Sequence, residues 1–178
     1  DRNKQKILRA IELTASLKLK YLTFHFGFID NTKPKLKERV KFLADAAGEN
    51  NVMILMETGQ EDAETLRDFL AELSHPALGV NFDPANMILY GKGDPVQALE
   101  TLAPWVKHVH IKDALRSPVA GKWGREVAWG EGDFDNNEFL STLSRIGYQG
   151  ALAIEREAGS TRMQDIQNTV RDLQQFSV

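Results

Sequence analysis

The sequence predicts an α/β fold in which an initial helix is followed by five strand–helix units that form a parallel sheet. Short apolar or alternating stretches recur along the chain, and each is followed by a segment with apolar residues at helical spacing. No two stretches are joined by a hairpin signal, so we expect parallel strands with right-handed crossovers.

The first elements are a helix at residues 3–18, with Asn3 in the position of an N-cap, and a buried strand at residues 21–28. A second helix begins at Pro34, because proline is tolerated in the first turn. Residues 52–57 are nearly all apolar, as expected of a parallel strand covered on both faces. The next helix carries the apolar stripe Leu66, Phe69, Leu70 and Leu73.

The second half of the chain continues the alternation. A strand at residues 78–83 precedes a helix with Asp94 as its N-cap and a proline in its first turn. Residues 106–113 alternate like a strand and lead into a glycine-rich connection at residues 114–133. The last elements are a helix with Phe139, Leu140, Leu143 and Ile146, a strand at residues 151–155, and a helix with Met163, Ile166, Val170 and Leu173.

An open doubly wound sheet and a (β/α)₈ barrel both satisfy this order of elements. No glycine-rich phosphate loop follows the first strand, which disfavours a nucleotide-binding sheet. Five units are too few to close a barrel, so the barrel interpretation requires roughly three further units upstream. We expect residues 1–178 to form a single, partial domain, because no linker or change in composition divides them.

Composition disfavours several classes of function. The formal net charge of −3 argues against a general affinity for nucleic acid or anionic membranes. No apolar run approaches the roughly 20 residues that span a bilayer, and no signal-peptide pattern opens the chain, so a cytoplasmic location fits. Because the chain has no cysteine, any metal must be held by oxygen and nitrogen ligands.

Ionisable side chains stand at the C-terminal ends of the predicted strands, at His25, Glu57, Asp83, His110 and Glu155. Parallel strands bring these ends to one rim, where the active sites of barrels form. One such carboxylate alone is commonly a helix cap or a solvated charge. Three carboxylates with one imidazole suit Mn²⁺, Mg²⁺, Co²⁺ or Zn²⁺, so we expect one divalent metal ion at Glu57, Asp83, His110 and Glu155.

The chain resembles the xylose-isomerase-like sugar phosphate isomerase/epimerase family in five motifs: M-E-T-G at 56–59, N-F-D-P-A-N at 81–86, H-V-H-I-K-D at 108–113, G-E-G-D at 130–133 and A-I-E-R-E at 153–157. The resemblance implies a (β/α)₈ TIM barrel of which this chain supplies the last five units. For the ketose-epimerase branch it implies that one divalent metal is held by Glu57, Asp83, His110 and Glu155. It further implies that Glu57 and Glu155 form the acid/base pair and that Arg116 contacts substrate.

Two positions separate the chain from the DNA-repair branch of that family. Related members have a histidine three residues after the aspartate, where this chain has Asn86, which we assign to substrate binding. The endonuclease IV branch, in which that histidine helps to hold a multi-zinc cluster, also has aspartate in place of His108. Both differences, together with the acidic net charge, disfavour DNA repair.

The expected reaction begins when a carboxylate removes a proton beside the carbonyl of a sugar or sugar phosphate, through a metal-stabilised enediolate. Return of the proton to the same carbon from the other face gives an epimerase, and return to the neighbouring carbon gives an isomerase. A lyase of the inosose or dehydroshikimate dehydratase type could use the same residues. A sugar-binding module without catalysis would keep the fold alone.

His25 and Lys112 are weaker candidates for substrate binding. A histidine packed between two phenylalanines is nearly as good an interpretation of His25, and an exposed strand-end lysine is the commoner case for Lys112. The apolar, aromatic strand at residues 21–28 has a further consequence, because an unclosed sheet would expose its edge. We expect residues 1–178 alone to aggregate, to form a homo-oligomer through that edge, or to need upstream units.

Overall fold

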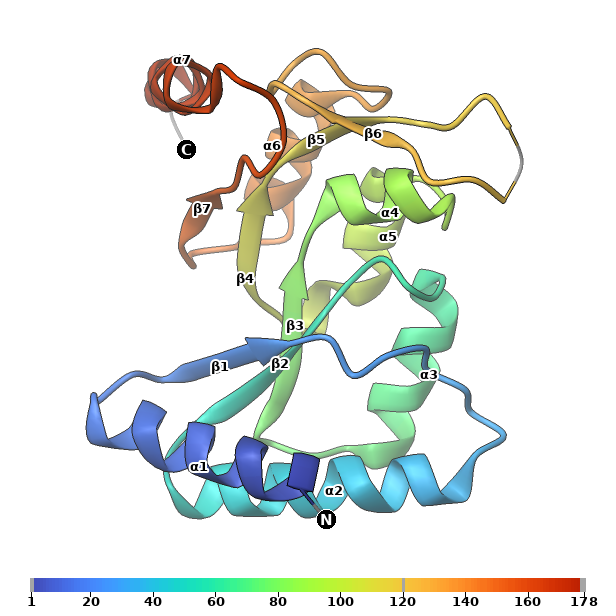
Figure 1. Ribbon diagram of the computed structural model, residues 1–178, viewed down its shortest axis with the longest axis vertical. Helices are drawn as coiled ribbons and strands as arrows, with labels where there is room; N and C mark the ends of the chain where they lie inside the picture. The colour runs from blue at the N-terminus through green and yellow to red at the C-terminus, as the bar shows by residue number, and fades with distance from the viewer. Residues whose placement is uncertain (1, 120, 177–178) are drawn as a thin grey trace.

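The computed structural model describes residues 2–119 and 121–176, and it shows an α/β half-barrel (Figure 1). One sheet contains five parallel strands in the order β1 (Tyr21–Phe24), β2 (Met53–Glu57), β3 (Leu78–Phe82), β4 (Val106–Ile111) and β7 (Leu152–Ile154). The prediction of a partial TIM barrel is confirmed, because the sheet ends at β1 on one side and at β7 on the other within the described residues.

Helices precede, connect and follow the strands, as the apolar spacing predicts. They are α1 (Arg2–Ser16), α2 (Pro34–Glu49), α3 (Ala63–Leu73), α5 (Pro95–Leu102), α6 (Asn136–Arg145) and α7 (Arg162–Gln175), with a short 3₁₀ helix, η1 (Ala103–Trp105), before β4. The side chains of Asp62, Asp94 and Asp135 accept backbone N–H groups at the starts of α3, α5 and α6. These caps satisfy donors that would otherwise have no intrahelical partner.

The structure corrects three expectations. An antiparallel pair, β5 (Asp113–Leu115) and β6 (Arg125–Val127), lies in the glycine-rich connection, so the prediction that the chain has no hairpin is wrong. An additional helix, α4 (Pro84–Tyr90), follows β3 directly, because Asp83 caps it and proline occupies its first turn. Strand β1 ends at Phe24 rather than at residue 28, and Gly27 beyond it has a left-handed φ of 80°.

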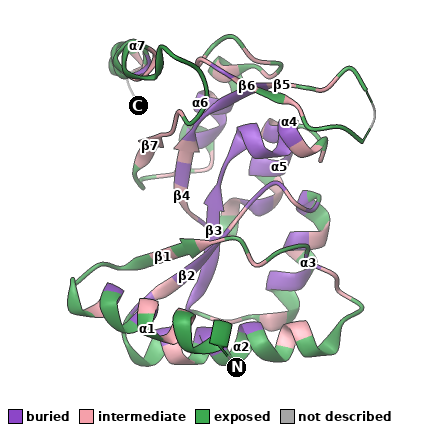
Figure 2. Cartoon of the chain, in the orientation of Figure 1, coloured by how far each residue is buried: buried purple, intermediate pink, exposed green. Residues whose placement is uncertain are grey.

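The hydrophobic core lies between the sheet and the connecting helices. All five residues of β3 are buried, and the largest fully buried side chains include Phe69, Phe82 and Phe139. Burial is concentrated on β3, β4 and α4, whereas β1 and α7 are largely exposed (Figure 2). Among the described residues no helix combines the length and the apolar character that crossing a bilayer requires.

A register shift between β3 and β4 aligns the polar residues of the sheet. Val80 pairs with Val106, but Asn81 pairs with His108, so Lys107 is the extra residue on β4. Side chains alternate along a strand, so the shift places Asn81 and His108 on the same face of the sheet. The next residue of β4 on that face is His110.

Candidate metal centre

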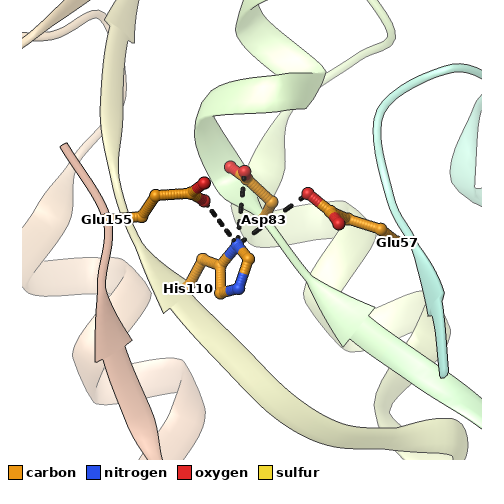
Figure 3. Close-up of side chains that lie close together, drawn as sticks. All are labelled: Glu57, Asp83, His110 and Glu155. Carbon is orange, nitrogen blue, oxygen red and sulfur yellow. Dashed lines mark ion pairs between the residues drawn. The ribbon is translucent and has the colours of Figure 1, made fainter. Parts of the chain in front are cut away.

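Four strand-end side chains meet at the carboxyl edge of the sheet (Figure 3). One potential ligand atom from each of Glu57, Asp83, His110 and Glu155 lies within 4.8 Å of the others. Glu57 ends β2, Asp83 follows β3, His110 lies near the end of β4, and Glu155 follows β7. Parallel pairing therefore assembles a cluster whose members are far apart in the sequence.

The three carboxylates surround one nitrogen of His110. Its Nδ1 atom is 2.8 Å from Glu155 Oε2, 3.6 Å from Asp83 Oδ2 and 3.9 Å from Glu57 Oε1. Figure 3 shows Glu57 and Glu155 on opposite sides of the ring, with Asp83 between them. Access from solvent is limited, because the side chain of Asp83 is 0% exposed and that of His110 is 14% exposed.

Three of these atoms are buried and lack a hydrogen-bond partner of acceptable geometry: Asp83 Oδ2, His110 Nδ1 and Glu155 Oε2. Buried polar atoms without partners are costly and uncommon in folded proteins. All three face the same point, and together with Glu57 they offer an oxygen and nitrogen donor set that suits a divalent cation. By this measure the residues present fit a metal ion.

Neighbouring groups orient the carboxylates. Asp83 Oδ1 accepts the backbone N–H of Asn86 at 3.0 Å, and Thr58 Oγ1 accepts the backbone N–H of Asp83 at 2.8 Å, so Asp83 Oδ2 stays free. The side chain of Asn86 donates from Nδ2 to Glu57 Oε1 at 3.1 Å. Gly59 has a φ of 125°, and a Cβ there would overlap Asn86, so this close approach requires glycine.

The cluster shifts the pKa values of its members in opposite directions. Burial is the main cause of a raised pKa at Glu57. Burial alone would lower the pKa of His110, but Asp83 and Glu155 outweigh it and raise that pKa to about 10. Contact with the His110 ring is the main reason why the pKa of Glu155 falls to about 2. The site therefore favours positive charge at its centre.

Lys112 is a buried charge beside the cluster. Its side chain is 4% exposed, and its Nζ lies 2.9 Å from Glu157 Oε2, 3.4 Å from Glu155 Oε2 and 3.7 Å from Asp83 Oδ2. Burial alone would lower its pKa, but the carboxylates outweigh that effect and raise it. Lys112 is therefore a charge partner of the cluster rather than an exposed lysine, and a role in substrate binding stays a prediction.

The other predicted substrate residues lie in different places. His25 Nε2 is 3.6 Å from Glu57 Oε1, and its side chain is 42% exposed, so His25 stands at the open side of the cluster. Arg116 donates to the carbonyl of Gly93 at 3.4 Å and lines a separate cleft of about 390 Å³ with Tyr90 and Trp123. None of the four clustered residues lines that cleft.

Two residues of the site had no assigned role in the sequence analysis. Asn81 is fully buried and contacts both His108 and His110, and Glu157 pairs with Lys112. Their spacing was an available signal, because Asn81 precedes Asp83 by two residues and Glu157 follows Glu155 by two. Residues two apart on a strand face the same side.

The family model described as xylose isomerase-like TIM barrel matches residues 1–176. Among curated proteins, inosose dehydratase from Clostridium tetani (strain Massachusetts / E88) is 26% identical over 161 residues, which cover 81% of this chain and 53% of that protein. The chain thus spans about half the length of this relative.

Solved structures show the same fold. A xylose isomerase domain protein from Planctomyces limnophilus is 35% identical, with a TM-score of 0.89 over 96% of this chain and 63% of that chain. A D-tagatose 3-epimerase-like protein is 21% identical, with a TM-score of 0.78 over 96% and 68% of the two chains. The IOLI protein, solved with a zinc atom, is 18% identical, with a TM-score of 0.76 over 95% and 68%.

Proposed function

Because this chain belongs to the xylose isomerase-like TIM barrel family, we propose that it is the metal-binding part of an enzyme that acts on a sugar, a sugar phosphate or a related polyol ketone. The observation that carries the proposal is the set of three buried atoms without hydrogen-bond partners, which face one point among Glu57, Asp83, His110 and Glu155. The zinc atom in the IOLI structure supports a divalent ion in a protein of this fold.

The four residues would bind the metal ion, and two of them would also transfer the proton. A divalent ion held by them would supply Lewis-acid polarisation of a carbonyl oxygen. Glu57 and Glu155 approach the centre from opposite sides, which suits a pair that removes a proton from one face of a substrate and returns it to the other (Figure 3). The lowered pKa of Glu155 keeps this carboxylate ionised, as a metal ligand and proton acceptor must be, whereas burial raises the pKa of Glu57, an effect that a bound cation would oppose.

An isomerase or epimerase is our first assignment, and a dehydratase is the second. The similarity to inosose dehydratase and to 3-dehydroshikimate dehydratase favours the second, whereas the D-tagatose 3-epimerase-like structure favours the first. Both reactions begin with loss of a proton beside a carbonyl, so Glu155 would act in either. The two reactions differ after this step, because epimerisation returns the proton to carbon and dehydration expels a hydroxyl group as water.

Substrate contacts are proposed for His25, Asn86, Lys112 and Arg116. His25 is the best placed of these, because it is partly exposed and adjacent to Glu57. Asn86 and Lys112 are already engaged with Glu57 and with Glu155 and Glu157, so they would act mainly by orienting those carboxylates. Arg116 would need to move its guanidinium away from Gly93 to reach a substrate at the cluster.

Metal analysis and isotope exchange test the proposal. The purified protein should retain a stoichiometric divalent ion and should catalyse exchange of a carbon-bound proton in deuterium oxide with ketoses or inososes. Deuterium incorporation without loss of water assigns an isomerase or epimerase, and formation of an unsaturated or dione product assigns a dehydratase. A protein that binds no divalent ion and exchanges no proton would contradict the enzyme assignment.

A further inference from the structure

Asn81 lies beside the proposed metal centre and is shared by two imidazole rings. Its side chain is 0% exposed. Its Oδ1 atom is 2.8 Å from His108 Nδ1, and its Nδ2 atom is 3.2 Å from His110 Nε2 and 3.3 Å from Thr23 Oγ1. The register shift between β3 and β4 creates this contact, because it sets Asn81 opposite His108 instead of Lys107.

The orientation of the Asn81 amide and the positions of the ring protons depend on each other. An amide oxygen only accepts hydrogen bonds, and an amide nitrogen only donates them. With Oδ1 toward His108, as here, His108 donates from Nδ1, and only a neutral His110 can accept at Nε2. A neutral His110 ring then carries its proton on Nδ1, the nitrogen that faces the three carboxylates. A cation cannot bind that nitrogen while the proton is there. A His110 ring with a proton on Nε2 needs the opposite orientation of the amide.

We infer that Asn81 is the positioning residue for His110, and that its amide presents Oδ1 to His110 Nε2 whenever His110 binds a metal through Nδ1. The inference rests on the metal centre proposed above. A His110 ring with a proton on Nε2 needs a hydrogen-bond acceptor there. The Asn81 amide supplies Oδ1 when it is rotated by half a turn from the orientation that places Oδ1 beside His108. The same rotation sets Nδ2 against His108 Nδ1, so His108 becomes an acceptor at Nδ1 and carries its proton on Nε2. Asn81 thus couples the protonation site of His108 to that of the metal ligand.

The ring nitrogens report this arrangement directly. Zn²⁺ alone is a suitable probe because it is diamagnetic, and the ¹⁵N shifts of the histidine rings distinguish the two tautomers. In the Zn²⁺-loaded protein we expect both His108 and His110 to carry their protons on Nε2, with signals assigned by substitution of each histidine. A Zn²⁺-loaded protein in which His108 keeps its proton on Nδ1 would overturn the inference.

Two substitutions separate positioning from packing. Asn81→Leu removes the acceptor and should weaken Zn²⁺ binding by about 10- to 100-fold, the usual cost of losing such a partner. Asn81→Asp keeps an acceptor for His110 and should bind Zn²⁺ within a few-fold of the unaltered protein, on the same principle. Aspartate cannot donate, however, so His108 in the Zn²⁺-loaded Asn81→Asp variant should return to the Nδ1–H tautomer.

The control is Thr142→Val, which alters a fully buried polar side chain on the outer helix α6 and should leave the Zn²⁺ affinity unchanged. Equal affinity in the unaltered protein and Asn81→Leu would overturn the role of Asn81 while leaving the metal centre intact. Equal weakening in Asn81→Leu and Asn81→Asp would also overturn it, because rescue by an acceptor is the signature of positioning. Failure of the unaltered protein to bind Zn²⁺ would overturn both the metal centre and this inference.

Discussion

Glu155 is the residue on which the proposed chemistry depends most, because it would both hold the metal and exchange the substrate proton. Glu155→Gln keeps the shape of the side chain but removes its charge and its basicity. We expect turnover to fall by at least about 10²- to 10⁴-fold, with a further loss from weaker metal binding. Steady-state assays at saturating metal, with thermal melting to verify the fold, measure this effect.

The matched control for that experiment is Glu100→Gln. Glu100 lies on α5 with its side chain 51% exposed, and it pairs with Arg145 outside the cluster. This substitution should leave turnover unchanged, because exposed ion pairs contribute little to stability. Near-normal activity of Glu155→Gln in the metal-saturated protein would count decisively against the assignment of Glu155 as an acid/base group.

The raised pKa of His110 predicts how metal binding depends on pH. The pKa of His110 in the folded, metal-free protein is raised from 6.5 to about 10, although burial opposes the shift, because Asp83 and Glu155 favour the charged ring. The proton on this ring therefore stabilises the metal-free fold fully below pH 6.5, and that contribution is lost as the pH rises toward 10. A cation must displace the same proton.

We therefore expect Zn²⁺ affinity to increase with pH across this window, by up to about tenfold per pH unit for one displaced proton. Calorimetric titrations in buffers with different ionisation enthalpies measure the number of protons released. His110→Gln serves as the control, because its weaker Zn²⁺ binding should lose most of this pH dependence. An affinity that is constant from pH 6.5 to 9 in the unaltered protein would refute the displacement of a His110 proton.

The sequence located the four clustered side chains because each stands at the end of a recognisable strand. Parallel pairing then leaves one geometric outcome, and the structure agrees with it. Asn81 and Glu157 were not assigned roles, since a buried amide or an extra carboxylate has many ordinary explanations. Only the register shift in β4 and the three-dimensional position of Lys112 reveal what these two residues contact.

At the scale of single elements, the loop that follows β6 is held by one buried carboxylate, at the start of β5. Asp113 is 1% exposed, and its Oδ2 accepts the backbone N–H groups of Gly130 and Gly132 and the side-chain amide of Asn136. A Cβ on Gly132 would overlap the Asp113 carboxylate, so glycine is required there. The Asp113 carboxylate thus holds this loop by hydrogen bonds rather than by strand pairing.

Asp113→Ala should lower the free energy of unfolding by several kcal/mol, because each buried donor left without a partner costs about 1–3 kcal/mol. Asp113→Asn should cost less, since its amide oxygen can still accept. Chemical denaturation of both variants measures the difference, with the exposed cap variant Asp94→Ala expected to lose about 0.5–2 kcal/mol. If Asp113→Ala is as stable as the unaltered protein, Asp113 does not organise this loop.

The elements that the sequence did not predict share a physical cause. Strands β5 and β6 have three residues each and are separated by a long connection, so neither periodicity nor a turn motif marks them. Helix α4 has seven residues, and its cap Asp83 had been assigned to the metal site alone. The longer helices and the central strands were predictable, because each buries a continuous apolar face.

At the scale of the whole molecule, strict alternation of strands and helices predicted a parallel sheet, and the family resemblance identified that sheet as part of a barrel. Alternation requires parallel pairing, and five strands cannot close at the geometry of an eight-stranded barrel. The length of β1 was overestimated because residues 25–28 continue its apolar pattern after the backbone has left the sheet. Its edge is consequently short, but Tyr21 is 40% exposed and Phe28 is 67% exposed beside it.

Open edges at β1 and β7 predict self-association of residues 1–178 when they are produced alone. An edge strand offers unpaired backbone groups, and the exposed aromatic side chains near β1 add apolar surface that favours contact with a second copy. We expect concentration-dependent dimers or larger species in size-exclusion chromatography with light scattering. Tyr21→Lys combined with Phe28→Lys should shift the population toward monomer, because charge on an edge opposes pairing.

The control for this shift is Val119→Lys combined with Trp123→Lys, which adds the same charge at two exposed apolar residues of the β5–β6 connection, away from β1, and should leave association unchanged. Thermal melting of the same samples tests whether association also stabilises the fold, in which case the melting temperature rises with protein concentration. A monodisperse monomer that melts cooperatively at every concentration would show that the two edges are protected. The half-barrel would then be stable without a partner for either edge strand.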